Sequence, residues 1–222
     1  MNPQLAQETV SIVLRGPFNP VLFHPSWFAA HNLIREREAE SAEVKIIHPS
    51  VAEFRAEWLE VQVVADRFQV STQQESFYEV LRDIISGVLD ILGPFNMTAM
   101  GINRQFQYQL ESEYAWHALG DILAPKNVWH DVLDTPGMAG LLMQGKRTDS
   151  LDGYIQVRVE PSRKIKFGVF IEINDHYQLS ERSNDEKAAS GYAITILLNQ
   201  WQTSMERSLH IAERIIRLGD AQ

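Results

Sequence analysis

Cysteine is absent from the 222-residue sequence, and this absence excludes disulfide bonds, thiol catalysis and zinc sites with cysteine ligands. Long apolar runs are absent too, since no stretch approaches the roughly 18 residues that a membrane-spanning helix requires. Residues 1–8 contain neither the basic region nor the apolar region of a signal peptide. From these absences we expect a soluble cytoplasmic protein of bacterial type, with no membrane partner.

Positive charge is also scarce, because 20 lysine and arginine residues stand against 29 aspartate and glutamate residues, giving a net charge of −9. A nucleic-acid backbone needs a clustered positive field, so the overall charge argues against such a partner. The densest basic stretch is a candidate hairpin that contains Arg158, Arg163, Lys164 and Lys166. We interpret it as the solvated face of that hairpin. Nucleic-acid binding stays an alternative if one sheet face gathers Arg67, Arg104, Arg158 and Lys166.

Hydrophobic residues make up 45% of the chain, which is enough for a sizeable core. Their spacing changes repeatedly between the two-residue period of strands and the 3.6-residue period of helices. Strands are expected at residues 9–14, 44–47, 59–64, 67–70, 96–110, 140–144, 154–159 and 165–173. These elements predict an α+β fold with a large, mainly antiparallel sheet.

Two long helices are expected to back this sheet. The first spans Glu75–Leu92 and ends at Gly93-Pro94, where glycine accepts a left-handed cap and proline cannot continue the helix. The second spans Asp185–Leu218. The segments Thr72–Glu75 and Ser183–Glu186 have the form of capping boxes and are expected to start the two helices.

The order β-α-β-β-β-α occurs twice, which favours an internal repeat. We expect one half at residues 1–93 and another at residues 94–222, packed as one globular unit. Trp27 and Trp116 occupy matching places in two similar helical stretches. Two such halves can join edge to edge into one curved sheet with an open face. In its order of elements alone, this arrangement resembles the TATA-box-binding-protein-like folds, and a fold does not fix a function.

The nearest match to a nucleotide-binding motif is a segment with Gly140, Gly145 and Lys146 at P-loop spacing. A P-loop needs serine or threonine directly after the lysine to hold magnesium, and Arg147 stands there instead. The residues between the glycines are bulky, whereas the loop needs free backbone N–H groups around phosphate. We interpret the segment as a strand that ends in a Gly-Lys turn.

Motifs for metal binding and catalysis are missing as well. No two histidines are spaced i, i+4, and the closest set of possible metal ligands is His117, His130, Asp131 and His176. The sequence has no Gly-x-Ser-x-Gly elbow, and Glu172 with Asp175 is the nearest carboxylate pair for hydrolysis. We therefore assign no catalytic residue and expect neither a metal nor a cofactor.

A small-molecule site in the concavity of the sheet is the second hypothesis for function. Gly101 lies inside a long extended run, which marks a bulge or a close backbone approach. Next to it, an Asn-Arg pair is able to grip a carboxylate or a phosphate. The candidate residues for ligand binding or hydrolysis are Asn103, Arg104, Glu172 and His176.

The leading hypothesis is a non-catalytic protein-binding or assembly subunit that forms a homodimer or binds another protein. The C-terminal helix is apolar on more than one stripe, and the chain contains five tryptophans. Ile194, Leu198 and Trp201 are expected to face the sheet, whereas Ile196 and others point elsewhere. The predicted interface consists of Trp201, Ile211, Ile215 and Leu218. Cover by the Glu75–Leu92 helix of the same chain is the alternative explanation for this apolar excess.

Calorimetry with magnesium and ATP or GTP is expected to detect no binding. The physical reason is Arg147, which stands where a P-loop hydroxyl would hold the metal ion. Micromolar binding that the Lys146→Ala substitution abolishes would contradict this prediction.

Overall fold

The computed structural model describes residues 3–94, 96–179 and 186–220, which form one open sheet and five α-helices. The strands are β1 (Gln4–Arg15), β2 (Glu43–His48), β3 (Val51–Ala56), β4 (Leu59–Val64), β5 (Arg67–Thr72), β6 (Ala99–Gln109), β7 (Leu141–Lys146), β8 (Gly153–Pro161) and β9 (Gly168–Gln178). The α-helices are α1 (Pro25–Ala30), α2 (Glu36–Glu40), α3 (Tyr78–Leu92), α4 (Glu113–Leu123) and α5 (Glu186–Ile216). Short 3-10 turns are η1 (Pro20–Leu22), η2 (Glu75–Phe77) and η3 (Arg217–Asp220).

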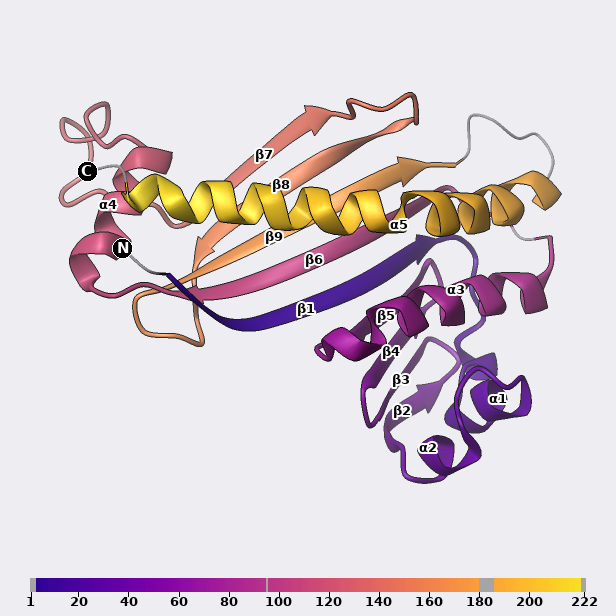
Figure 1. The fold of residues 1–222 in the computed structure, drawn as a ribbon. Helices are drawn as coiled ribbons and strands as arrows, with labels where there is room; N and C mark the ends of the chain where they lie inside the picture. Colours follow the sequence, from indigo (N-terminus) through magenta and orange to yellow (C-terminus); the bar gives the residue numbers. More distant parts are fainter. Residues whose placement is uncertain (1–2, 95, 180–185, 221–222) are drawn as a thin grey trace.

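The nine strands are all antiparallel and lie in the order β2-β3-β4-β5-β1-β6-β9-β8-β7. Helices α3 and α5 lie along one face of this sheet, and α1 and α2 lie at the end that carries β2 (Figure 1). This architecture confirms the predicted α+β fold. Within the described residues, no helix is long and apolar enough to cross a membrane.

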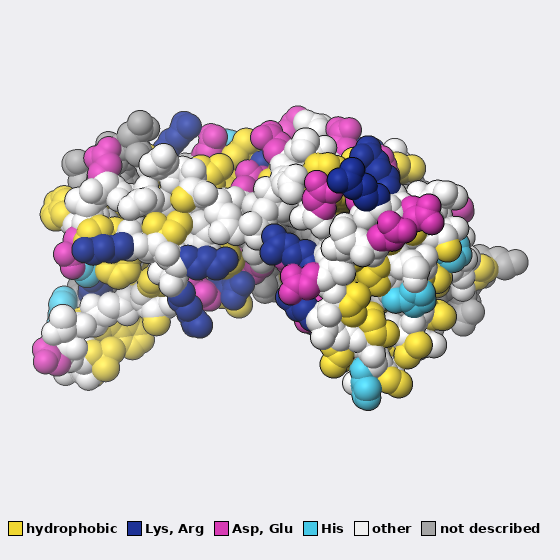
Figure 2. All heavy atoms as spheres, turned by 90° about the horizontal axis from the view of Figure 1, so that it is seen from below, with side chains coloured by type: hydrophobic (Ala, Val, Ile, Leu, Met, Phe, Trp, Pro, Cys, Tyr) yellow, Lys and Arg dark blue, Asp and Glu magenta, His cyan; other side chains and the backbone are white. Residues whose placement is uncertain are grey.

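Alternating burial along the strands gives the sheet one apolar face and one polar face. In β9, Ile171, Ile173 and Tyr177 are fully buried on the side of the helices, while Glu172 and His176 between them are partly exposed on the other side. We call this second side the open face. In a view from below, a hollow on the side away from α5 separates the two ends of the molecule (Figure 2). Period-two alternation is the expected signature of a sheet covered on one side only.

The buried side chains form a larger and a smaller core, and α5 takes part in both. Ala193, Leu197 and Trp201 pack into the larger core with α3 and the N-terminal strands. Ala212 and Ile216 pack into the smaller core with α4 and the C-terminal strands. The helix therefore holds the two ends of the sheet together from one side.

The strands of the two predicted halves meet at the central β1–β6 pair, whereas α5 packs against strands of both. In each half the last strand returns beside the first, as β5 pairs with β1 and β9 pairs with β6. The N-terminal half contains a strand that the sequence interpretation missed, β3, so the two halves differ in strand number. Trp27 lies in α1 and Trp116 in α4. Duplication of one ancestral half stays a prediction.

The helix starts differ from the expectation. Thr72 ends β5, and its hydroxyl accepts a hydrogen bond from the backbone N–H of Gln74 at 3.2 Å, so it does not cap α3. A 3-10 turn over Glu75–Phe77 precedes that helix instead. The second capping box falls mostly on residues 183–185, which lie outside the described residues.

The apolar stripe assigned to α5 is also partly wrong. Leu198 was expected to face the sheet but is 55% exposed, while Ile196 was expected to face elsewhere and is only 2% exposed. The buried positions form one stripe whose middle is polar, and a search for apolar residues alone therefore chose the wrong phase. This stripe consists of Ala193, Leu197, Trp201, Ser204, Ser208, Ala212 and Ile216.

Two glycines with positive φ give a matched test of backbone strain. Gly93 (φ 69°) ends α3 in open space, and we expect Gly93→Ala to cost about 1–3 kcal/mol of unfolding free energy. Gly153 (φ 138°) faces the His176 carbonyl oxygen, which would lie 2.0 Å from an added Cβ atom. Gly153→Ala should cost more, because β8 and β9 would have to separate. Urea denaturation measures both variants, and equal losses would contradict the prediction.

Candidate functional site

The middle of α5 crosses the sheet between the two cores, and this crossing is polar. Ser204 and Ser208 are each 1% exposed, and their small side chains let the helix lie close to the strands. Arg104 of β6 donates to the Met205 carbonyl oxygen of α5 at 2.6 Å and forms an ion pair with Glu8 of β1 at 2.5 Å. These bonds fix one side of the helix to the central strands.

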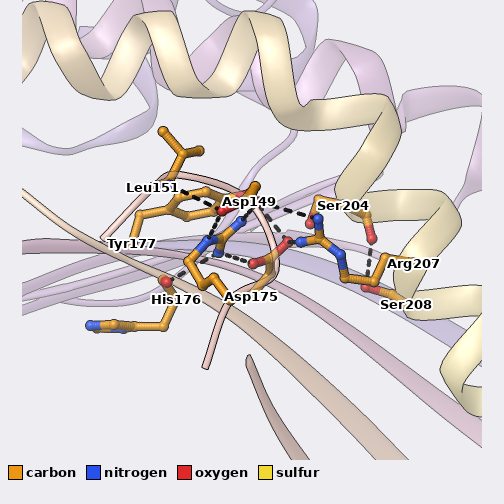
Figure 3. A network of polar contacts seen from close by, with 9 residues as sticks. Asp149, Leu151, Asp175, His176, Tyr177, Ser204, Arg207 and Ser208 are labelled. Carbon is orange, nitrogen blue, oxygen red and sulfur yellow. Dashed lines mark hydrogen bonds and ion pairs between the residues drawn. The ribbon is translucent and has the colours of Figure 1, made fainter. Parts of the chain in front are cut away.

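A denser set of charges fixes the other side, and Figure 3 shows it from close by. Asp175 of β9 is fully buried, and its carboxylate accepts hydrogen bonds from Arg147 and from Arg207 of α5, the latter at 2.8 Å. Arg147 also forms a bidentate pair with Asp149 at 2.6 and 2.8 Å. Tyr177 adds a hydroxyl donor to Asp175 at 3.2 Å, and its ring centroid lies 4.0 Å from the Arg147 Cζ atom. We call these five residues the buried ion network.

The electrostatics of the buried ion network follow from burial and pairing. Hydrogen bonds from Arg147 hold the pKa of Asp149 below its usual range. Burial, together with the nearby Asp175 charge, raises the pKa of the Tyr177 hydroxyl, so the phenol stays protonated and donates. Two arginines face two aspartates, and each charged group has a partner of opposite sign.

This arrangement suits a structural role better than a chemical one. Every charge is paired, so the buried ion network offers no unpaired nucleophile, base or anion site. Its members come from the loop after β7, from β9 and from α5, and together they attach helix and loop to the sheet. Across residues 3–94, 96–179 and 186–220, no three His, Asp or Glu side chains gather in a way that could hold a metal ion.

The sequence interpretation missed this network because it ended the strand at Ile173. In the structure β9 continues to Gln178. The same alternation that buries Ile173 and Tyr177 puts Asp175 between them on the helix face, and this signal could have found it. Glu172 and Asp175 do not form a carboxylate pair, because they lie on opposite faces of β9.

The four predicted ligand residues do not come together. Asn103, Glu172 and His176 lie on the open face, where Asn103 is opposite Asn174 in the neighbouring strand. Arg104 lies on the helix face, bonded to Glu8 and α5 as described above, so the predicted Asn-Arg grip does not exist. Neighbouring residues of one strand point to opposite faces, and this period of two separates them.

Gly101 makes no bulge, because β6 pairs in unbroken register with both neighbours around it. Instead, the absence of a side chain at Gly101 leaves room for Asn174 of β9, because an added Cβ atom would lie 3.1 Å from Asn174 Oδ1. That oxygen is buried and has no hydrogen-bond partner among the described residues. A ligand in the concavity with an N–H or O–H donor would satisfy it, so the small-molecule hypothesis stays a prediction for Asn103, Glu172 and His176.

Several charged side chains of the open face are held by polar neighbours on the same face. Arg158 donates to Glu172 at 2.7 and 3.0 Å, and Gln105 donates to the other carboxylate oxygen of Glu172 at 2.6 Å. Arg67 donates to Gln62 at 2.7 Å. Burial lowers the pKa of His176, which stacks on Tyr154 with ring centroids 4.3 Å apart. The face does not gather the four basic residues considered for nucleic-acid binding, since Arg104 points to the other side.

The predicted interface residues are mostly covered by their own chain. Trp201 is 3% exposed in the larger core, and Ile211 and Ile215 pack partly buried against the smaller core. Leu218 is 37% exposed. A dimer contact through the four predicted residues stays a prediction, and of these four Leu218 is the most exposed.

Exposed apolar side chains lie at both edges of the sheet and also in the segment after α4, where Val128, Trp129, Val132 and Leu133 are 50–71% exposed. In β2, Val44, Ile46 and Ile47 are 37–48% exposed, and in β7, Leu142 and Met143 are each 58% exposed. Apolar side chains gather visibly at the end that carries α1, α2 and β2 (Figure 2). Exposed apolar groups on an edge strand are typical of surfaces that pair with another chain.

No protein-family model matches the chain, and no curated protein resembles it significantly in sequence.

Removing one charge from the buried ion network should be far more costly than removing one from the open face. Asp175→Asn leaves two arginines short of a buried partner, and we expect a loss of about 3–5 kcal/mol of unfolding free energy. Glu172→Gln, on the same strand, is the matched control and should cost about 1 kcal/mol or less because its ion pair is partly exposed. Urea denaturation at neutral pH measures both, and a similar loss in the two variants would contradict this role.

Proposed function

We propose that this protein is a non-catalytic binding subunit that self-associates through strand β7, which continues the sheet into a second copy. The supporting observation is that β7 is an edge strand of the sheet. Among the described residues, β7 pairs with β8 and with no other strand. Its second side therefore offers a row of backbone N–H and C=O groups for another strand. Leu142 and Met143, both largely exposed, would be covered by that pairing.

The opposite edge of the sheet is less suited to pairing. In β2 the register shifts between Val44 and Ile46, and such a bulge twists an edge away from a partner. Lys45 in this bulge forms an ion pair with Glu53 at 2.7 Å. By contrast, β7 has an unbroken register with β8, and its first charged side chain is Lys146 at its end.

A two-fold axis perpendicular to the sheet would pair β7 with itself in the antiparallel sense and keep each face on the same side. When this axis passes through Leu142, that residue lies opposite Leu142 of the second copy. Met143 then lies opposite Leu141 of the second copy, which alternates onto the same face. This register places apolar side chains opposite apolar ones on both faces, and such cross-strand pairs stabilise a sheet. The fit of β7 to itself favours a second copy over an unrelated peptide.

The wild-type protein is expected to be a dimer in analytical ultracentrifugation at tens of micromolar, and Leu142→Lys is expected to be a folded monomer. The two-fold register places the new lysines directly opposite each other, where like charges destabilise a strand pair. The dissociation constant should rise at least tenfold. Because Leu142 is exposed, the thermal midpoint of the isolated chain should change little.

Two controls make the experiment specific. Leu142→Ile keeps an apolar strand-forming residue and should stay dimeric. Ile46→Lys places the same charge on the β2 edge and should stay dimeric as well. A monomeric wild type, or a dimer that Leu142→Lys leaves intact, would overturn the proposal. A dimer that only Leu218→Lys separates would support contact through the C-terminal helix instead.

A further inference from the structure

A partly enclosed pocket of about 180 Å³ lies beneath α4, at the end of the molecule opposite α1 and α2. Its walls come from α4, residues 135–138, β8 and β9. The apolar side chains that line it are Trp116, Leu119, Met138, Val159 and Val169. Three of these, Leu119, Val159 and Val169, belong to the smaller core and are no more than 4% exposed, so the inner wall is packed against that core.

Trp116 is held in place as one wall of this pocket. Its indole Nε1–H donates to the Gly168 carbonyl oxygen at 3.0 Å, so the polar end of the ring is satisfied within the protein. The rest of the ring is left to make apolar contact with the pocket. A wall that is fixed before a ligand arrives lowers the entropy cost of binding.

The charged side chains at the pocket are already paired within the chain. Lys126 forms an ion pair with Asp121 at 2.5 Å, and Glu160 forms one with Arg158 at 3.4 Å. A charged ligand would have to compete with these pairs, and its own charge would lose hydration on entering the apolar part. The pocket therefore favours a neutral molecule.

Size narrows the class of ligand further. Typical sites for drug-sized molecules measure about 300–1,000 Å³. An apolar protein cavity of about 150 Å³ is large enough to bind benzene. From the volume, the apolar wall and the paired charges we infer that this pocket binds a neutral aromatic molecule of one ring or two fused rings. No residue of β7 lines this pocket, and the inference does not rest on self-association.

Indole is a suitable probe, with benzoate as its charged comparison. Indole should shift the Trp116 Nε1–H signal in two-dimensional NMR saturably, with a dissociation constant in the millimolar range or below. The loss of one signal in Trp116→Phe identifies that resonance among the five tryptophans. Benzoate should bind at least tenfold more weakly, because its carboxylate is costly to desolvate.

A glycine in the lining allows the pocket to be filled without disturbing the fold. Gly120 of α4 lines the pocket, and a Cβ atom there would meet no heavy atom within 4 Å. Gly120→Leu should weaken indole binding at least tenfold, and exchanging glycine for leucine favours a helix. Gly191→Leu is the matched control, because Gly191 is an exposed glycine of α5 with the same open surroundings. Gly137→Leu fills the pocket from its other wall and replaces Gly120→Leu if that variant misfolds.

The inference is supported if indole binds to wild type and to Gly191→Leu but not to the filled variants. It is overturned if indole gives no saturable shift at Trp116 up to its solubility limit. Binding that survives in both filled variants, or equally tight binding of benzoate, would overturn it too.

Discussion

Where α5 passes over the middle of the sheet, charges are buried, and the structure depends on every one of them having a partner. A fully buried aspartate at this point is tolerable only because two arginines reach it, one from the helix and one from the loop after β7. Arg104 and Glu8 make a second, partly buried pair on the other side of the helix. The apolar cores lie before and after this crossing, so hydrophobic burial fixes the ends of α5 while ion pairs fix its middle. Directional bonds of this kind specify how far the helix lies along the sheet, which apolar packing alone leaves less well defined.

The sequence predicted the fold class, most strands and both long helices, because these follow from local periodicity. The sequence-based prediction failed where a strand extends beyond the residues that show a clear apolar pattern. Val51–Ala56 alternates as a strand should, but no strand was predicted between residues 47 and 59, and β3 was missed. The predicted strand 165–173 stopped at Ile173, although the polar residues after it continue β9 to Gln178. Because the predicted strand was too short, Asp175 was not recognised as a buried residue of β9. Its ion pairs with Arg147 and Arg207 were therefore missed. Asp175 lies far from both arginines in sequence, and the periodicity of the sequence does not predict an ion pair between them.

The candidate ligand residues illustrate a different limit. Arg104 and Asn103 are neighbours in sequence, which suggested a joint grip, yet the pleat of β6 sends them to opposite faces. Long-range pairing then decides what each one does. Arg104 donates to the Met205 carbonyl oxygen of α5, and Glu172 accepts hydrogen bonds from Arg158 and Gln105. Within the described residues, the β7 edge keeps unpaired backbone groups and the pocket beneath α4 keeps unfilled space. Neither can be recognised from composition. The edge exists because β7 has a neighbouring strand on one side only, and the pocket exists because the surrounding side chains do not fill the space between them.

Packing into both cores constrains the helical phase of α5. Trp201 and Ala212 enter different cores but on the same side of the helix, about three turns apart. One inserted or deleted residue between them would rotate everything downstream by about 100° and shift it by about 1.5 Å. Ala212 and Ile216 would then leave the smaller core, and Arg207 would turn away from Asp175. A change of about one whole turn restores the phase but shifts the downstream residues by about 5.4 Å along the sheet. The length of this stretch is therefore more constrained than the identity of the residues on its exposed side.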